Sequence, residues 1–362
     1  MDSETPGPQR KRRRVIVIGA LLFFLGAVVV PAPLLLAHYH AIEHREQHHA
    51  AIYSLEFSRD GRFVVATDAN GVLSELDLSN PLDVRYGHRA SRRIDLSESF
   101  VVGDGKPSRT SPLASMLERN GTRAALVFKK HFMWTSWLHP EEVFVFDLDK
   151  WKAGEPFGAW QKQTEGFATS PCGDRFVITV WDQLELWDPH TRRRLWSVAI
   201  GGLSEAGHNT FSPDGRLIAS AGDDAISVRS SLDGRSVVTL PHTLSLGEKV
   251  GFSSDGDSIV FVGESDATIW CWKTGQQRRL RALGSVGGGM EVYFSASGRY
   301  VVATFNVGGV QVWDLASDTT ASLPLRTKAR PLCLAPSPVA DTVAVGFNDG
   351  AIELHDLRDA MR

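Results

Sequence analysis

Cysteine is scarce in this chain of 362 residues, and neither sign of charge is in clear excess. The three cysteines, Cys172, Cys271 and Cys333, are too few and too scattered for a small domain held together by disulfide bonds. The 39 basic and 42 acidic side chains leave a net charge of −3, which excludes a nucleic-acid-binding protein with a uniformly basic surface.

Motifs for catalysis and metal binding are also missing. The sequence has no Gly-x-Ser-x-Gly segment, phosphate-binding loop, zinc-ligand spacing or carboxylate pair in a persuasive context. Five histidines between His38 and His49 have no acidic or cysteine partner in a known ligand pattern, so we interpret them as solvated side chains. We therefore expect no catalytic residue, no metal and no cofactor, and we predict that the protein is not an enzyme.

Apolar residues, tryptophan and glycine are plentiful. Hydrophobic residues make up 43% of the chain, too large a share for an intrinsically disordered protein. The ten tryptophans and 33 glycines together indicate many strands joined by many turns. These numbers bear on the fold and name no function.

The first forty residues predict a membrane anchor. Residues 10–14 are all basic, and residues 15–37 contain no charged side chain, which is enough to cross a hydrocarbon core as one helix. The positive-inside rule places residues 1–14 in the cytoplasm and residues 38–362 on the extracytoplasmic side of a single-pass protein. A cleaved signal peptide is the alternative, but the apolar run is longer than such peptides usually have, which favours an uncleaved signal anchor.

Two sequence markers then recur with a period of about 42 residues. The first is a turn, Phe-Ser-x-Asp-Gly, which ends at Gly61, Gly215 and Gly256, with weaker copies elsewhere. The second follows about 16 residues later and is best preserved as Trp187-Asp188 and Trp313-Asp314. Short β-rich runs lie between the markers, and Asp-Gly turns are typical of tight hairpins. The pattern predicts seven copies of a small antiparallel sheet.

These repeats resemble those of the WD40-repeat β-propellers over about residues 41–358. The resemblance implies an all-β, seven-bladed propeller with four strands in each blade, formed by residues 38–362. The Trp-Asp pair survives intact only at Trp187-Asp188 and Trp313-Asp314. The buried His–Asp–Ser–Trp hydrogen-bond network of the family is therefore expected to be missing from most blades.

The last repeat ends with its third strand, over residues 351–356, close to the end of the sequence. Its fourth strand has to come from elsewhere, or the sheet keeps an open edge. In the family this strand commonly comes from the N-terminal end, which points to residues 39–47 here. Their composition is poor for a strand, so both alternatives stay open.

Two insertions interrupt the second repeat, at about residues 83–109 and 128–141. The second lies between the second and third strands of its blade and therefore on the top face of the propeller. It combines cations with large aromatic side chains, which are typical of interface anchors. We predict a partner-binding site there, although the aromatic rings could instead pack onto the propeller. The candidate residues are Lys129, Lys130, His131, Phe132, Trp134 and Trp137.

The sequence thus predicts a membrane-anchored, non-catalytic scaffold that binds protein partners through its propeller and the membrane through residues 15–37. No nucleic-acid partner is expected, because the basic stretch around the insertions belongs to an otherwise acidic domain. An enzyme or a small-ligand binder that uses the central channel of the propeller is the alternative. Charged side chains converging on the mouth of that channel would favour this alternative.

Overall fold

The computed structural model divides the chain into two units, with the boundary between His49 and Ala50. The described residues all belong to the second unit and cover 50–69, 72–79, 92–95, 113–119, 122–129, 141–148, 150, 152–153, 157–160, 164–180, 182–200, 208–222, 225–241, 249–263, 265–284, 287–307 and 309–362. The predicted anchor (15–37) and the predicted closing strand (39–47) lie outside these residues. Within them, no helix is both long and apolar enough to span a bilayer.

The described strands form seven antiparallel sheets, which we number in chain order. Sheet 1 contains β1 (Ile52–Phe57), β2 (Phe63–Asp68), β3 (Val72–Asp77) and β4 (Arg92–Asp95). Sheet 2 contains β5 (Leu113–Arg119), β6 (Thr122–Lys129), β7 (Glu141–Asp147), β8 (Lys152–Ala153) and β9 (Phe157–Trp160). Sheet 3 contains β10 (Thr164–Thr169), β11 (Phe176–Val180), β12 (Gln183–Asp188) and β13 (Arg193–Ala199).

The remaining sheets repeat the same order. Sheet 4 contains β14 (His208–Phe211), β15 (Leu217–Ala221), β16 (Ala225–Ser230) and β17 (Ser236–Pro241). Sheet 5 contains β18 (Val250–Phe252), β19 (Ser258–Val262), β20 (Asp266–Cys271) and β21 (Gln276–Arg281). Sheet 6 contains β22 (Gly287–Phe294), β23 (Tyr300–Val307), β24 (Gly309–Asp314) and β25 (Thr319–Ser322). Sheet 7 contains β26 (Pro331–Pro336), β27 (Thr342–Phe347) and β28 (Ile352–Asp356), and the short helix η2 (Asp359–Met361) follows it.

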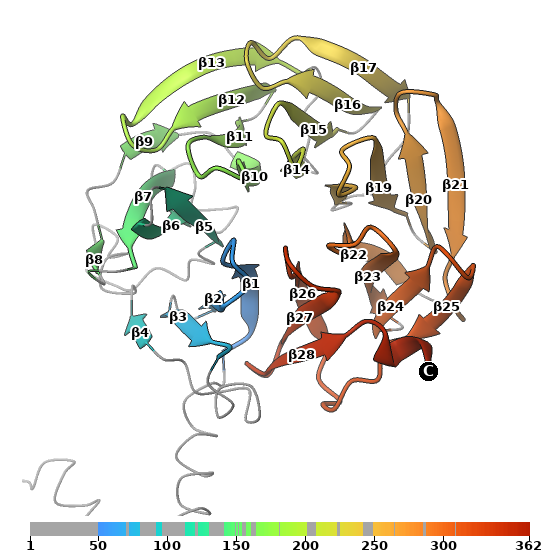
Figure 1. The fold of residues 1–362 in the computed structure, drawn as a ribbon. Coiled ribbons are helices and arrows are strands. Elements are labelled where there is room, and N and C mark those ends of the chain that lie inside the picture. Colours follow the sequence, from blue (N-terminus) through green and yellow to red (C-terminus); the bar gives the residue numbers. More distant parts are fainter. Residues whose placement is uncertain are drawn as a thin grey trace, which may run out of the picture. The chain divides into compact units, whose positions relative to one another are not determined.

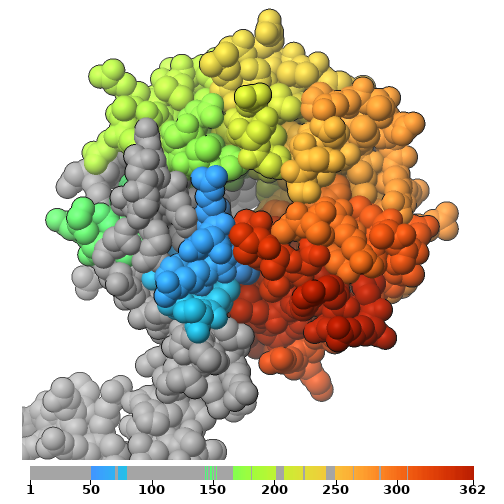
Figure 2. Space-filling model, in the orientation of Figure 1, coloured from blue at the N-terminus to red at the C-terminus, as the bar shows by residue number. Residues whose placement is uncertain are grey.

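Within the second unit, the sheets follow one another around a ring, with the first strand of each sheet innermost (Figure 1). The ring brings its first and last strands together, because β1 lies beside β26 in both views (Figures 1 and 2). The Cys333 thiol contacts the Ile52 carbonyl oxygen across this seam at 3.5 Å. This radial arrangement of small sheets is the all-β propeller that the repeats predicted.

The prediction of seven four-stranded blades needs a correction. Six of the sheets have four or more strands, and sheet 7 has three among the described residues. The physical reason is the one that the repeat pattern suggested, since the last repeat supplies strands only as far as β28. Within the described residues, the ring therefore consists of six blades with at least four strands and one sheet with three.

The core lies between the sheets, on both faces of each second strand. All five residues of β11 are buried, and so are the first six residues of β23. Such strands have neighbours on both sides in their own sheet and another sheet against each face, so an apolar run replaces the usual alternation of polar and apolar residues. The outer strands β13 and β17 instead alternate between exposed and half-buried residues.

The recurring Phe-Ser-x-Asp-Gly turn links the first and second strands through local hydrogen bonds. In sheet 1 the Ser58 hydroxyl donates to Asp60 at 2.6 Å and accepts the Phe63 N–H at 2.8 Å. Gly61 has a φ of 71°, which favours glycine. The hydrogen bond from Ser58, together with the Arg62 N–H, lowers the pKa of Asp60 below its ordinary value. The same serine–aspartate and serine–backbone hydrogen bonds form in the turns of sheets 4 and 5. The first sequence marker therefore stabilises the turn between the first and second strands.

The tryptophans of the second marker hydrogen-bond to groups other than a second-strand hydroxyl. Trp187 donates to Glu185 at 2.9 Å, Trp272 to the Gly256 carbonyl at 2.9 Å, and Trp313 to the Arg281 carbonyl at 2.8 Å. The buried hydroxyls of Ser220 and Thr304, on second strands, have no hydrogen-bond partner within the described residues. Trp272 therefore binds the turn of its own sheet and Trp313 binds the end of β21 in the neighbouring sheet, whereas the Trp187 hydrogen bond stays within β12.

Candidate interaction face

Strand order defines two faces of the ring. In sheets 1, 4 and 5 the first strand runs toward a Ser-x-Asp-Gly turn, and we call the end of the ring with these turns, and with the corresponding turns of the other sheets, the bottom face. The opposite end, where the first strands begin and the second strands end, is the top face. The connections from each outer strand to the next first strand also lie on the top face, because the strands of a sheet alternate in direction.

The insertions fall within sheets 1 and 2 as follows. Part of the segment 83–109 forms β4, the outer strand of sheet 1. The segment 128–141 connects β6 to β7, so it leaves sheet 2 at the top face as predicted. Lys129 is the last residue of β6 and is opposite Glu142 in β7. The other candidates lie outside the described residues, and their role stays a prediction: Lys130, His131, Phe132, Trp134 and Trp137.

Sheet 6 presents two exposed apolar side chains on the top face. Leu283 is 47% exposed and Val307 is 62% exposed. The buried side chain of Gln311 fixes the loop at Leu283, accepting its N–H at 2.7 Å and donating to its carbonyl at 2.9 Å. Val307 ends β23, which is paired with β22 as far as Gly287. The hydrogen bonds to Gln311 thus fix the backbone at Leu283, and the pairing of β23 with β22 fixes the backbone at Val307.

Arg330 places a cation at the top end of β23. Its N–H donates to Asn348 Oδ1 at 2.9 Å, and its carbonyl accepts the Asn348 N–H at 3.0 Å, which fixes its backbone in front of β26. Its guanidinium reaches across to sheet 6, where it donates to Asn306 Oδ1 and lies 3.6 Å from Met290 Sδ. Asn306 immediately precedes Val307 in β23, so Arg330 binds one residue away from an exposed apolar residue at the top end of this strand.

A buried ion pair lies below this surface and joins three sheets. Glu291 in β22 accepts hydrogen bonds from Lys249 Nζ, just before β18, and from the Leu334 N–H in β26. Burial lowers the pKa of Lys249, but the attraction to Glu291 outweighs it and holds that pKa above its ordinary value. Burial also raises the pKa of the neighbouring Tyr293 hydroxyl.

This ion pair bears on the alternative that a ligand binds in the centre of the ring. Charged side chains do converge there from neighbouring sheets, which is the feature expected of a ligand site. However, each Glu291 carboxylate oxygen already has a donor, one from Lys249 and one from the Leu334 backbone. A carboxylate satisfied in this way holds sheets together, because leaving either partner unpaired would be costly. The arrangement is that of a structural cross-link.

In the described part of the chain, the cysteine thiols and the potential metal ligands do not cluster into a common site. Cys172 is exposed, Cys271 is half-buried and Cys333 is buried, and all three are free thiols. Burial raises the pKa of the Cys333 thiol well above its ordinary value. Among the described residues, no group of three or more His, Cys, Asp or Glu side chains could hold a metal ion.

Sequence reasoning did not single out Leu283, Val307 or Arg330. Leu283 and Arg330 come from connections between sheets and Val307 from the end of β23, outside the repeated markers, so no periodic signal identifies them. Arg330 and Asn306 are 24 positions apart and belong to different sheets, and only the ring brings them together. The one available signal was their place in the segments between markers, where loops carry variable side chains.

The ring of small antiparallel sheets, each built from one sequence repeat, defines the protein as a β-propeller. A family model described as "WD domain, G-beta repeat" (WD40) matches residues 42–74. Residues 42–74 thus match a WD40 repeat, and the fold of the described residues is that of a β-propeller.

Relatives of known identity match part of the chain. Apoptotic protease-activating factor 1 of Mus musculus is 28% identical over 189 residues, which is 52% of this chain and 15% of that protein. The protein of the same name from Rattus norvegicus matches with the same identity over the same shares. The chain therefore aligns with only a small part of these relatives, and their activities as whole proteins are not transferred to it.

Proposed function

We propose that this protein is a membrane-anchored, non-catalytic scaffold whose propeller binds protein partners through its top face. The observations that carry the proposal are the exposed apolar side chains of Leu283 and Val307 and the cation of Arg330, each held by hydrogen bonds or strand pairing on the top face. Exposed apolar side chains next to arginine are characteristic of protein interfaces. The WD40-repeat fold supports the same reading, because it offers a rigid platform for such surfaces.

The basic and aromatic hairpin at residues 129–137 belongs to the same proposal. It leaves sheet 2 at the top face, at the end of β6. We assign it as a second contact region for partners on this face. The net positive character shared by the hairpin and Arg330 favours partners with acidic surfaces.

We further propose that residues 15–37 anchor the chain as a single-pass membrane protein, with the propeller on the extracytoplasmic side. The proposal rests on the length of the uncharged segment and on the five basic residues before it. N-terminal sequencing of the protein recovered from carbonate-washed membranes tests it. An intact N-terminus in the membrane pellet supports the anchor, and a chain that begins beyond residue 37 in the soluble fraction contradicts it.

The scaffold function is tested by quantitative co-purification of the full-length chain from detergent-solubilised membranes. Val307→Asp places a charge in the centre of the proposed surface without disturbing the core, because Val307 is largely exposed. Val339→Asp is a matched control, since Val339 is 61% exposed but lies in a turn of the bottom face. Specific partners should be lost from the Val307 variant and kept by the Val339 variant. Identical sets of bound proteins in both variants would contradict the top-face assignment.

A further inference from the structure

The outer strands of sheets 3 and 4 share an irregularity that turns one apolar side chain outward in each. In β13 the pairing with β12 shifts between Arg194 and Trp196, so Leu195 is an extra, bulged residue. In β17 the pairing with β16 shifts in the same way between Ser236 and Val238, so Val237 is bulged. The corresponding pairs β20–β21 and β24–β25 have no such shift. A β-bulge re-aims side chains at a sheet edge.

The two bulged side chains are exposed together with a third one. Leu195 is 50% exposed and Val237 is 51% exposed. Leu232, in the turn between β16 and β17, is 84% exposed and is the most exposed of the large apolar side chains in the described residues. We use the term rim surface for these three apolar side chains together with the neighbouring arginines, which are Arg192, Arg193, Arg194 and Arg235. Three exposed apolar side chains on two neighbouring sheets indicate an interaction site more strongly than one exposed leucine does.

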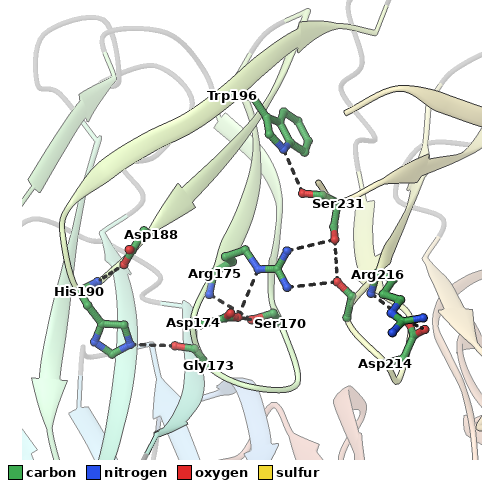
Figure 3. A network of polar contacts seen from close by, with 11 residues as sticks. Ser170, Gly173, Asp174, Arg175, Asp188, His190, Trp196, Asp214, Arg216 and Ser231 are labelled. Atoms are coloured by element: carbon green, nitrogen blue, oxygen red, sulfur yellow. Dashed lines mark hydrogen bonds and ion pairs between the residues drawn. The ribbon is translucent and has the colours of Figure 1, made fainter. Parts of the chain in front are cut away.

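A hydrogen bond between the two sheets joins the residue after Leu195 to the residue before Leu232. The indole N–H of Trp196, next to Leu195, donates to the carbonyl of Ser231, next to Leu232, at 3.1 Å (Figure 3). Gly234 lies directly over this tryptophan, because a Cβ on Gly234 would be 2.8 Å from Val198 and 3.1 Å from the indole ring. The turn that carries Leu232 is therefore packed onto β13.

Polar contacts beneath the rim surface hold the turn rigid. The Ser231 hydroxyl donates to the Gly215 carbonyl at 2.7 Å and accepts from Arg175 Nη1 at 3.1 Å (Figure 3). Arg175 is itself bound to Asp174 at 3.3 Å. A side chain displayed on a support of this kind loses little conformational freedom when a partner binds, which favours affinity.

The charges around the three apolar side chains are mainly positive. Arg192, Arg193 and Arg194 precede Leu195 and are exposed. Arg194 pairs with Glu185 at 2.7 Å, whereas Arg193 has no ion pair within the described part of the chain. Near Leu232, Arg235 lies 3.9 Å from Asp233, and both are exposed. A complementary partner is therefore acidic as well as apolar.

We propose that the rim surface of sheets 3 and 4 is a second docking site, which binds a protein segment with apolar side chains flanked by aspartate or glutamate. The apolar side chains of the segment contact Leu195, Leu232 and Val237, and its carboxylates pair with Arg193 and the neighbouring arginines. The bulges interrupt the regular ladder of the outer strands, so the segment binds through side chains and does not extend the sheet. This site lies on other sheets than the top-face surface and does not depend on it.

A phage-displayed library of random peptides, selected on the full-length chain in detergent, tests the proposal. Enriched peptides should combine Asp or Glu with apolar residues. Their Kd should rise about tenfold or more in Leu232→Asp and in Arg193→Glu, and it should change little in the conservative variant Leu232→Ile. Both altered side chains are exposed, so the thermal unfolding midpoint should match that of the wild type and show that the fold is retained.

Val307→Asp separates this proposal from the top-face function. Acidic, apolar peptides that lose affinity in Leu232→Asp and Arg193→Glu but not in Val307→Asp support the rim surface. Peptides that lose affinity only in Val307→Asp overturn the rim surface and leave the scaffold function standing. Peptides without acidic enrichment, or with equal affinity for all variants, overturn the rim surface as well.

Discussion

Arg299 and Asp314 form a bidentate ion pair on the bottom face of sheet 6. Arg299 Nε donates to Asp314 Oδ1 at 3.0 Å, and Nη2 donates to Oδ2 at 2.6 Å. Arg62 and Asp77 repeat the pairing in sheet 1, with Nη2 to Oδ2 at 3.0 Å. The aspartate of the second sequence marker thus binds an arginine that precedes the second strand, and it ties the third strand to the first turn.

Removal of Asp314 should destabilise the propeller. Its carboxylate is buried, and it accepts the Ala316 N–H at 3.0 Å in addition to the arginine. Because hydrogen bonds to charged groups contribute more than neutral ones, Asp314→Ala should lower the free energy of unfolding by about 2 kcal/mol. Chemical unfolding followed by tryptophan fluorescence measures this. A loss as small as that of an exposed control, Asp318→Ala, would contradict the assignment.

Stability should fall in acid through the same pairs. Hydrogen bonds from Arg62 and Ser79 lower the pKa of Asp77 to about 2. A carboxyl group whose pKa is lower in the folded than in the unfolded chain stabilises the fold above the unfolded pKa, and this contribution disappears as the pH falls through the folded value. The stability difference between wild type and Asp77→Asn should therefore shrink between about pH 4 and pH 2. Unfolding curves at several pH values measure it, and a constant difference would show that the pair contributes nothing.

The seam between sheets 7 and 1 should tolerate no added methyl group. A Cβ on Gly346 would lie 2.6 Å from Cys333 Sγ and 2.8 Å from Ile52 Cγ2. Since overpacking a well-filled core typically costs about 1–3 kcal/mol, Gly346→Ala should lower the unfolding midpoint measurably. Gly288→Ala is a matched control, because its nearest atom would be 3.7 Å away. Equal midpoints for the two variants would contradict a tight seam at this point.

The cysteines should differ in reactivity. Cys172 is exposed in a turn of sheet 3, whereas Cys333 is buried at the seam and burial raises its pKa. The thiolate is the reactive form, so Cys172 should react with maleimide in the folded protein and Cys333 only after unfolding. Mass spectrometry of peptides labelled before and after denaturation checks this. Rapid labelling of Cys333 in the native state would show that the ring opens at the seam.

Much of the fold could be predicted from the sequence because its determinants are local. The turn at Ser58, Asp60 and Gly61 is formed by side chains and backbone groups that are close in the sequence, so the sequence alone predicts this turn. The spacing also predicted seven four-stranded blades, which the structure corrects to six, and it left open which residues complete the sheet of the last repeat. The repeated markers therefore carry most of the architecture.

The surfaces could not be predicted in this way. Leu195 and Val237 are exposed because their strands shift register by one residue, and that shift depends on pairing with a neighbouring strand rather than on either residue alone. Arg330 meets Asn306 only because the ring places sheets 6 and 7 side by side. The partner-binding role of the segment that the sequence did single out, at residues 129–137, remains a prediction.

Site-specific photo-crosslinking in living cells tests the top-face assignment most directly. A photoreactive amino acid in place of Val307 should give discrete adducts with partner proteins. The same group in place of Val339, which is equally exposed on the bottom face, should not give those adducts. Matching adducts from both positions, or none from position 307, would contradict the account of the top face as the partner-binding surface.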